Sequence, residues 1–262
     1  MATPSAPRKP KRNAAPAKVK AKAKASSSAD AAPTEREPRG ARRKRETRAK
    51  LLDAAFRLMA ERGMEGVAIN EITEAADVGF GSFYNHFESK ESIYDALMNL
   101  VFEDFAKALG ELVSDVDDPA KAVAFSVRHT VMRARREPVW GQFLLREGYS
   151  ARVLTRGLGQ FMMRDLARGV AAGRFKAPDL FLAFVAVGGT VLAAISAEQQ
   201  AGTEKSPQAA LLKQMGMSVG DIPERTATMI MGILGLPPKE AASIARLPLP
   251  AVSTKSGISP VR

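Results

Sequence analysis

Hydrophobic side chains recur at three- and four-residue spacing through most of this chain from residue 51 onward. An α-helix turns once in about 3.6 residues, so this spacing gathers hydrophobic side chains on one face of a helix. The pattern predicts an amphipathic helix that begins between Ala41 and Thr47, ends near Arg62 and is capped by Gly63. Its hydrophobic positions are Leu51, Leu52, Ala55, Phe56, Leu58 and Met59.

The same spacing predicts helices along most of the remaining chain. A short helix is expected at about 69–76 and another at about 80–87, separated by a break at Asp77-Val78-Gly79. Ser89 is a good N-cap for a longer helix that follows. Because strand-like alternation is almost missing, the expected fold class is all-α. The later helices are expected at 90–113, 119–136, 138–148, 151–172, 179–200 and 222–235, with a short one near 238–246.

The charge of the chain is concentrated at its amino-terminal end. Residues 1–50 hold 16 Lys and Arg against 4 Asp and Glu, which leaves 23 basic and 24 acidic residues in the rest. Residues 1–40 have too few hydrophobic side chains to offset the entropy of ordering, so we expect a disordered basic tail. It could be a solvated tail or a non-specific phosphate contact, and a polyanion partner would be nucleic acid or an anionic membrane. Residues 201–220 and 247–262 are also expected to be loosely ordered.

Several protein classes are disfavoured by what the chain lacks. It has no cysteine, only two histidines, and no glycine-rich phosphate loop, so we expect no enzyme, no cofactor and no metal site. No secretory signal is evident. The longest hydrophobic stretch, 180–195, is short for a membrane span and is interrupted by Gly188-Gly189. We therefore expect a buried helix in a cytoplasmic protein without membrane contact.

The two short helices and their break predict a helix-turn-helix, whose second helix enters a DNA major groove about 12 Å wide. Hydrophobic side chains occupy the positions that must face inward, and small or polar side chains occupy the positions that must face outward. The inward set is Ile69, Ile72, Ala75, Ala76, Val78, Phe83 and Phe87. The outward set is Gly81, Ser82, Tyr84, Asn85 and His86.

The run GFGSFYNHFESKE at 79–91 resembles the recognition helix and following turn of the TetR family of bacterial regulators. Arg45-Glu46-Thr47-Arg48 and the stretch 60–78 fit the same family. The resemblance implies a three-helix DNA-binding domain at 45–105, with its helix-turn-helix at about 68–87. The residues it assigns to DNA binding are Thr47, Gly79, Phe80, Gly81, Ser82, Tyr84, Asn85, His86 and Lys90.

Within this set the resemblance implies separate roles. Tyr84, His86 and Lys90 would contact phosphates, whereas Ser82, Asn85 and the backbone at Gly81 would face base edges. Phe87 would belong to the core. The alternatives are a packing role for His86, and for Tyr84 a core aromatic whose hydroxyl reaches water.

The sequence departs from the family pattern at the start of each short helix. Ala68 stands where the family usually has Thr, and the lost hydroxyl cap could cost about 0.5–2 kcal/mol unless another group replaces it. Asp77 stands where Gly is common, although Asp tolerates a left-handed backbone. Gly79 and Phe80 replace the usual hydroxyl and polar residues. Phe80 could touch a thymine methyl group or fold back onto the core.

The resemblance further implies that residues 106–246 form a helical domain that dimerises and binds a small molecule. For a hydrophobic or aromatic effector we expect a pocket at Phe102, Phe105, Phe125, His129, Met132, Trp140, Phe143, Tyr149, Phe161 and Met162. For the dimer interface we expect Gly188, Gly189, Leu192, Ile195, Met229, Ile230 and Ile233. Both sets could instead be plain core.

The resulting prediction is a homodimeric repressor that leaves a palindromic DNA operator when a small molecule binds. The alternative is a nucleoid-type protein that binds DNA non-specifically through its basic tail.

Overall fold

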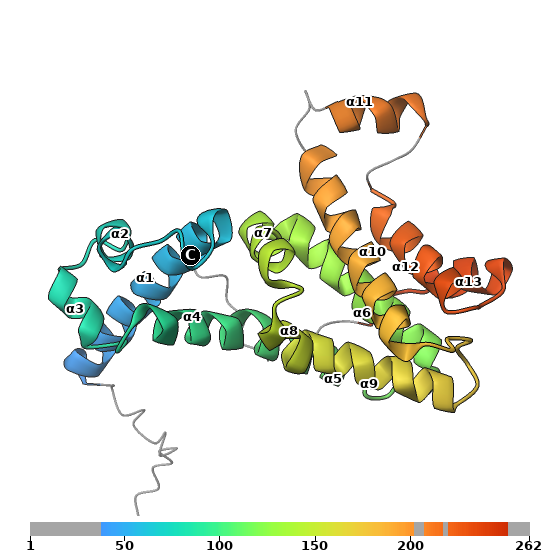
Figure 1. The fold of residues 1–262 in the computed structure, drawn as a ribbon, viewed down its shortest axis with the longest axis horizontal. Coiled ribbons are helices and arrows are strands. Elements are labelled where there is room, and N and C mark those ends of the chain that lie inside the picture. The colour runs from blue at the N-terminus through green and yellow to red at the C-terminus, as the bar shows by residue number, and fades with distance from the viewer. Residues whose placement is uncertain (1–37, 202–206, 217–219, 251–262) are drawn as a thin grey trace, which may run out of the picture. The chain divides into compact units, whose positions relative to one another are not determined.

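The computed structural model describes residues 38–201, 207–216 and 220–250. Every regular element in these ranges is a helix, which confirms the all-α fold class (Figure 1). The predicted basic tail lies outside the described residues as far as residue 37, and most of the predicted carboxy-terminal tail, from residue 251, does so too. Residues 39 and 40 belong to the first helix and not to the tail.

The amino-terminal part consists of four helices with the predicted breaks between them. They are α1 (Arg39–Arg62), α2 (Ile69–Ala75), α3 (Phe80–Tyr84) and α4 (Lys90–Met98). Gly63 ends α1 with a φ of 76°, and Asp77 turns the chain between α2 and α3 with a φ of 52°. Ser89 caps α4 by accepting a 3.3 Å hydrogen bond from the Ser92 amide. Each of these features is formed within one or two turns of chain, which is why the sequence predicted it.

Helix α2 begins after Ala68, whose side chain cannot accept a hydrogen bond at the N-cap. The carboxylate of Glu71 accepts a 2.8 Å hydrogen bond from the amide of Ala68 and a second, also 2.8 Å, from the guanidinium of Arg62. These two contacts, the backbone one first, lower the pKa of Glu71. Glu71 thus makes the half of a capping box in which the third helical residue accepts from the N-cap amide, and its charge favours the helix dipole. No side chain at the N-cap takes the place of the missing hydroxyl.

The remaining helices form a second layer of packing in which α12 lies against α6, α10 and α13 (Figure 1). They are α5 (Asp104–Leu112), α6 (Pro119–Arg136), α7 (Pro138–Glu147), α8 (Ala151–Thr155), α9 (Gly157–Ala171), α10 (Leu180–Ala201), α11 (Pro207–Gln214), α12 (Ile222–Ile233) and α13 (Pro238–Ala245). Asp118 caps α6 through the Ala120 amide at 2.9 Å, and Pro119 takes its first turn, as the sequence predicted.

Three segments differ from the prediction. The expected helix 90–113 contains a π-helical turn, η1 (Asn99–Glu103), and α11 forms within 201–220, where no helix was expected. The expected helix 151–172 breaks before Gly157, which has a φ of 53°. A Cβ at Gly157 would lie 3.3 Å from the carbonyl group of Phe102, so this break lets α9 approach η1 closely. Such an approach depends on packing between distant segments and leaves no local signal.

A cluster of aromatic side chains joins the two parts of the fold. Trp140 and Phe143 of α7 are fully buried, Phe143 stacks on Phe102 with ring centroids 5.7 Å apart, and Phe105 meets Trp140 edge-on at 5.0 Å. The indole N–H of Trp140 donates to the carbonyl of Val101 at 3.3 Å. Since Val101 lies in the π-helical turn, where regular helix bonding is interrupted, the indole helps to satisfy a buried backbone acceptor.

Candidate nucleic-acid interface and ligand cavity

The outer face of α3 is open to a partner, whereas its inner face is core. Phe83 is fully buried and Phe87, just after the helix, is 5% exposed, so both belong to the core as expected. Tyr84 is 52% exposed, which rules out its placement as a core aromatic. A Cβ added at Gly81 would meet no atom within 4 Å, so the backbone there can be approached closely. Asn85 is exposed at the C-cap of this helix.

Phe80 does not fold back onto the core. Its side chain is 54% exposed, and its ring meets the ring of Tyr84 edge-on with centroids 5.7 Å apart. Two aromatic side chains therefore form a small ridge on the outer face of α3. Phe80 faces outward, as contact with a base methyl group would require.

Positive charge surrounds the end of α3 where His86 lies. The guanidinium of Arg48, on α1, lies 4.9 Å from the ring centroid of Phe87. Burial, followed by the positive charges of Lys44 and Arg48, lowers the pKa of the half-buried His86. Thr47 is half-buried on the same helix. These side chains bring the amino-terminal half of α1 to the recognition element.

Lys90, which the resemblance assigns to phosphate contact, is partly covered and already lies near a carboxylate. Its side chain is 21% exposed, and its ammonium lies 3.9 Å from a carboxylate oxygen of Glu65. Contact with a phosphate would require the ammonium to exchange this weak ion pair, which costs little near the surface.

Helix α7 contacts α1 and α4 through two neighbouring side chains at its carboxy-terminal end. The Arg146 guanidinium donates to the carbonyls of Ala60 at 3.3 Å and Glu61 at 2.6 Å, at the carboxy-terminal end of α1. The next residue, Glu147, accepts a 2.5 Å hydrogen bond from the hydroxyl of Tyr94 on α4. A cation at a helix carboxy-terminus pairs with its free carbonyls and its dipole.

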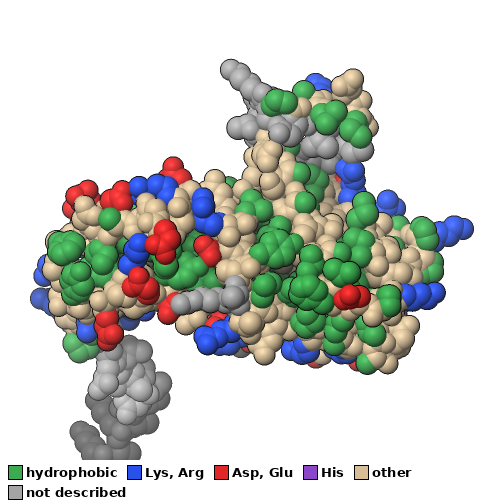
Figure 2. Space-filling model, viewed as in Figure 1, with side chains coloured by type: hydrophobic (Ala, Val, Ile, Leu, Met, Phe, Trp, Pro, Cys, Tyr) green, Lys and Arg blue, Asp and Glu red, His purple; other side chains and the backbone are tan. Residues whose placement is uncertain are grey.

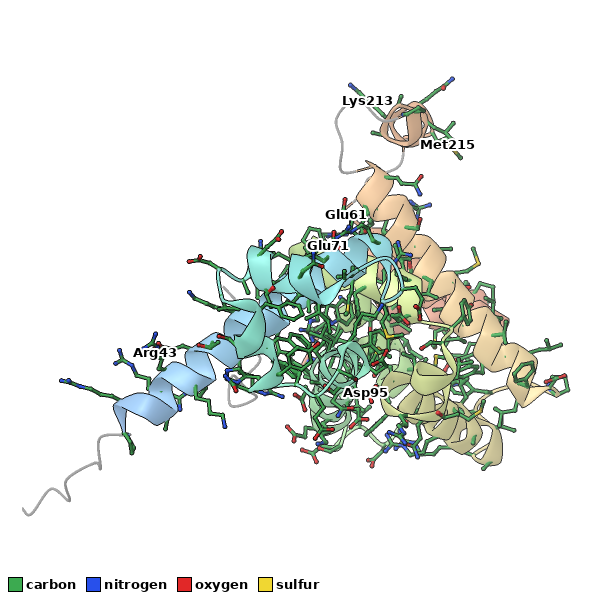
Figure 3. The ribbon with its side chains drawn as sticks, turned by 60° about the vertical axis from the view of Figure 1, so that its left-hand side comes forward. Arg43, Glu61, Glu71, Asp95, Lys213 and Met215 are labelled. Carbon is green, nitrogen blue, oxygen red and sulfur yellow. The ribbon has the colours of Figure 1, made fainter. Side chains whose placement is uncertain are left out.

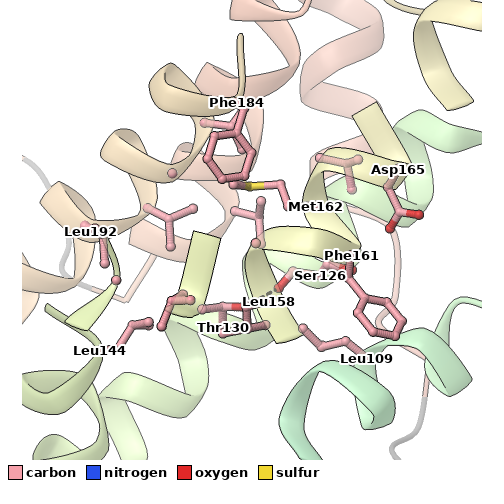
Figure 4. Close-up of a pocket in the computed structure, with 18 of the residues that line it drawn as sticks. Leu109, Ser126, Thr130, Leu144, Leu158, Phe161, Met162, Asp165, Phe184 and Leu192 are labelled. Atoms are coloured by element: carbon pink, nitrogen blue, oxygen red, sulfur yellow. Dashed lines mark hydrogen bonds between the residues drawn. The ribbon is translucent and has the colours of Figure 1, made fainter. Parts of the chain in front are cut away.

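A cavity of about 120 Å³ lies among α5, α6, α7, α8, α9 and α10 (Figure 4). Its wall is largely aliphatic and aromatic, and a few polar groups interrupt it. Asp165 of α9 is only 6% exposed and pairs with the guanidinium of Arg164 at 3.0 Å. Thr130 donates its hydroxyl proton to the carbonyl of Ser126 at 2.8 Å, and the hydroxyl of Tyr149 lies 3.4 Å from the carbonyl of Val185. The cavity therefore offers one carboxylate and several hydroxyl groups in hydrophobic surroundings.

Of the ten residues predicted for the pocket, three line this cavity, namely Tyr149, Phe161 and Met162. Seven do not line it, namely Phe102, Phe105, Phe125, His129, Met132, Trp140 and Phe143. Four of these form the aromatic core described above, and Phe125 packs in a separate cluster with Val113 and Ala122. His129 is buried elsewhere, and burial followed by the charges of Arg136 and Arg128 lowers its pKa. The large aromatic side chains were therefore a good guide to which residues are buried, but not to which residues line the cavity.

The residues that sequence reasoning missed are mostly aliphatic and common in any core. Asp165 is the exception, because an acidic side chain on the buried face of a helix with Phe161 and Met162 signals a special environment. The missed lining residues include Leu109, Val127, Leu144, Leu158, Phe184 and Val187.

Some of the residues predicted for the dimer interface are buried inside the chain, and others lie on its surface. Ile195 and Ile230 are fully buried within the chain, so their assignment to an interface is wrong. Gly188 and Leu192 line the cavity. A Cβ at Gly189 would lie 2.9 Å from the Tyr149 hydroxyl, so this glycine makes room for a side chain of its own chain.

The outer sides of α10 and α12 carry large hydrophobic side chains. Phe181 and Leu182 are 65% and 59% exposed, and Met229 and Ile233 are 62% and 40% exposed. Figure 2 shows hydrophobic side chains gathered on the part of the molecule where α9 and α10 lie. Large hydrophobic side chains that lie exposed together are typical of a binding face.

Helix α10 was expected to be buried, and only part of it is. It is the helix, among the described residues, that is long and hydrophobic enough to cross a membrane, and 28% of its most hydrophobic window is buried. It packs against α6, α7, α9 and α12, as a helix of a folded domain does. The described residues contain no group of three or more His, Cys, Asp or Glu placed to hold a metal ion.

Two family models match this chain. Residues 51–97 match the model described as bacterial regulatory proteins of the tetR family, and residues 118–247 match a tetracyclin repressor-like C-terminal domain. The solved structure of RolR in complex with resorcinol is 37% identical, with a TM-score of 0.56, and the match covers 81% of this chain and all of that chain.

Curated relatives match over the amino-terminal part. The transcriptional repressor DhaR of Mycobacterium sp. (strain GP1) is 38% identical over 72 residues, which cover 28% of this chain and 36% of DhaR. The repressor KstR2 of Rhodococcus jostii (strain RHA1) is 39% identical over 67 residues, which cover 26% of this chain and 33% of KstR2. The chain thus spans about a third of the length of these two relatives.

Proposed function

This chain belongs to the TetR family of bacterial transcriptional regulators, and from that premise we propose that it is a homodimeric repressor released from DNA by a small hydroxylated aromatic molecule. Family membership makes it a DNA-binding regulator. The observation that carries the proposed mode of binding is the division of α3 into a buried side at Phe83 and an exposed side at Phe80 and Tyr84. We propose no catalytic role, and we place the protein in the cytoplasm with its DNA.

Replacing Asn85 by Ala is expected to change which bases are preferred and to leave contacts with phosphates intact. Asn85 is exposed at the end of α3, and each lost base contact costs about 1–3 kcal/mol at its own position. The test is selection of bound sequences from a random duplex library at a fixed salt concentration, with Glu88→Ala as an exposed control. An unchanged preference in Asn85→Ala would remove the base-reading role.

The wild-type selection also separates the two modes of DNA binding. A palindromic motif is expected, because a two-fold dimer places two recognition helices on two half-sites. Binding without any enriched sequence, lost steeply as salt rises, would instead favour a nucleoid-type protein that acts through its basic tail.

The outer faces of α10 and α12 support dimerisation. Phe181 and Leu182 on one helix and Met229 and Ile233 on the other leave large hydrophobic side chains exposed on helices that pack together. A second copy that presents the same face would cover them in an interface of two helices from each copy. Helix α10 also lines the cavity and α12 packs against α10, so ligand and dimer contacts would share one framework.

The cavity supports an effector with a single ring. RolR, a relative over its whole length, has been solved with resorcinol. An engineered hydrophobic cavity of about 150 Å³ holds benzene, so about 120 Å³ suits a small aromatic molecule. Asp165 would accept a hydrogen bond from a hydroxyl group of the ligand, and the hydrophobic walls would hold the ring.

Helix α7 is the proposed route from the cavity to DNA. Leu144, Gly148 and Tyr149 line the cavity, and Arg146 and Glu147 between them bind α1 and α4. A ligand that moves the cavity wall would therefore move the contacts that orient the DNA-binding helices.

Replacing Arg146 by Gln is expected to weaken coupling and to leave resorcinol binding within about twofold of wild type. Coupling between sites is typically worth about 1–3 kcal/mol, so we expect at least a fivefold smaller effect of resorcinol on operator affinity. The measurement is operator binding with and without saturating resorcinol, beside calorimetric titration of the ligand. Gln142→Ala, one turn earlier on the exposed side of α7, is the control. Full release in Arg146→Gln would contradict this route.

A further inference from the structure

The first three turns of α1 form a dense cluster of positive charge. Residues 39–50 contain seven Lys and Arg and a single acid, Glu46, and all of these charged side chains are exposed. The match to the family model begins at residue 51, so the cluster precedes the matched segment of this helix. Figure 3 shows these turns, with Arg43 labelled, extending past the helices that α1 packs against.

Two of these side chains continue the buried stripe of the helix. Lys44 and Arg48 lie one turn apart, and Leu51 and Ala55 follow them at three- and four-residue spacing. Leu51 and Ala55 are fully buried against the other helices. Lys44 and Arg48 therefore face the side on which the DNA-binding helices lie, whereas Arg39 and Arg42 face away from it.

The contacts of Arg48 show where this stripe leads. Its guanidinium lies over the ring of Phe87 at 4.9 Å, directly beyond the recognition helix α3. His86, which precedes Phe87, is close enough to Lys44 and Arg48 that their charges, after burial, lower its pKa. Their positive charges are thus gathered beside the residues proposed to meet DNA. Arg48 holds its guanidinium in place by stacking, so little entropy is lost when it binds an anion.

We propose that Lys44 and Arg48 form a second contact with the DNA duplex, binding backbone phosphates beside the groove that α3 enters. This inference rests on the proposed function, because it requires α3 to enter a major groove. Phosphate contacts position a protein on DNA and add affinity that depends on salt and not on sequence. A duplex fits better than an anionic membrane, because the two side chains adjoin the recognition element and not the hydrophobic face of α10 and α12.

The experiment measures operator affinity against salt concentration for the full chain, for Lys44→Gln and for Lys44→Gln/Arg48→Gln. Each lost phosphate contact lowers the slope of log affinity against log salt by about 0.9. Since the proposed dimer carries two copies of each side chain, the double variant is expected to lose about 3.6. Arg39→Gln/Arg42→Gln removes the same charge from the opposite side of α1 and is expected to lower the slope by less than half as much. The motif selected from a random library should be the same in all variants.

The outcomes are separable. An equal loss of slope in the two double variants would show that DNA is attracted by the overall charge of the helix. It would overturn specific phosphate contacts by Lys44 and Arg48. Unchanged slopes in Lys44→Gln and in the double variant would overturn the proposal altogether. If the loss of Arg48 disturbs the packing on Phe87, the slope of the single variant Lys44→Gln still tests the proposal. Loss of binding to vesicles with 30% phosphatidylglycerol, with DNA slopes unchanged, would assign the surface to a membrane. Absence of any selected motif in wild type would instead count against the proposed function.

Discussion

Replacing Met229 by Glu is expected to convert the dimer into monomers and to reduce operator affinity by about a hundredfold or more. Met229 is 62% exposed on α12, beside Ile233, on the outer face that we assign to the interface. In a two-fold interface each patch meets a second copy of itself, so one substitution brings two carboxylates into a hydrophobic contact. Burying them without partners is costly. The loss of affinity follows because two linked half-site contacts bind about 10²–10⁴-fold more tightly than one.

The measurement is sedimentation equilibrium beside operator binding for the same preparation. Ser243→Glu introduces the same charge at an exposed position of the neighbouring helix α13 and should leave both unchanged. Because Met229 is exposed within one chain, its replacement should lower the melting temperature of the monomer little. A Met229→Glu protein that remains dimeric with wild-type affinity would exclude this face as the interface.

Replacing Asp165 by Asn is expected to weaken resorcinol binding by about tenfold to a hundredfold and to raise the resorcinol concentration needed for release from DNA equally. Asn keeps the volume of the side chain and removes its charge. A hydrogen bond to a charged group contributes about 1.5–3 kcal/mol, more than one to a neutral group. Affinity for the operator without ligand should be unchanged, since Asp165 lies in the cavity and away from α3.

Calorimetric titration with resorcinol and operator release measured in parallel check this result. Asp104→Asn, an exposed substitution on α5, is the control for charge. Arg164 is exposed, so Asp165→Asn leaves no buried charge without a partner, and loss of stability is not expected to obscure the result. Equal resorcinol binding in Asp165→Asn would remove the carboxylate from the ligand site. If wild type fails to bind resorcinol, the effector class is wrong, and the DNA-binding role is unaffected.

Much of the amino-terminal part could be predicted from sequence because its signals are local. Gly63 and Asp77 turn the chain through their own backbone conformations, and Ser89 caps α4 through a residue three positions away. The inward and outward sides of α3 follow from helical periodicity alone, with Phe83 buried and Tyr84 exposed. In a short helix whose hydrophobic side chains all lie on one face, that face is the one that packs against the core.

The cavity and the faces of α10 depended on tertiary structure. Helix α10 is hydrophobic on nearly all sides, so its sequence pattern did not distinguish Ile195, which is buried, from Leu182, which is exposed. The largest aromatic side chains were predicted to line a pocket, yet Trp140 and Phe143 fill the core. Phe80 was undecided between solvent and core until its exposure was known.

The sequence by itself determined the helical class, the breaks of the DNA-binding element and its family, because those depend on residues within a few turns of one another. Only the tertiary structure decided that Asp165 faces a cavity, that α9 begins at Gly157 against Phe102, and that Arg146 joins α7 to α1. Each of these contacts joins segments that lie far apart in the chain. Hydrophobic periodicity states which side of a helix is covered, and it does not state what covers it.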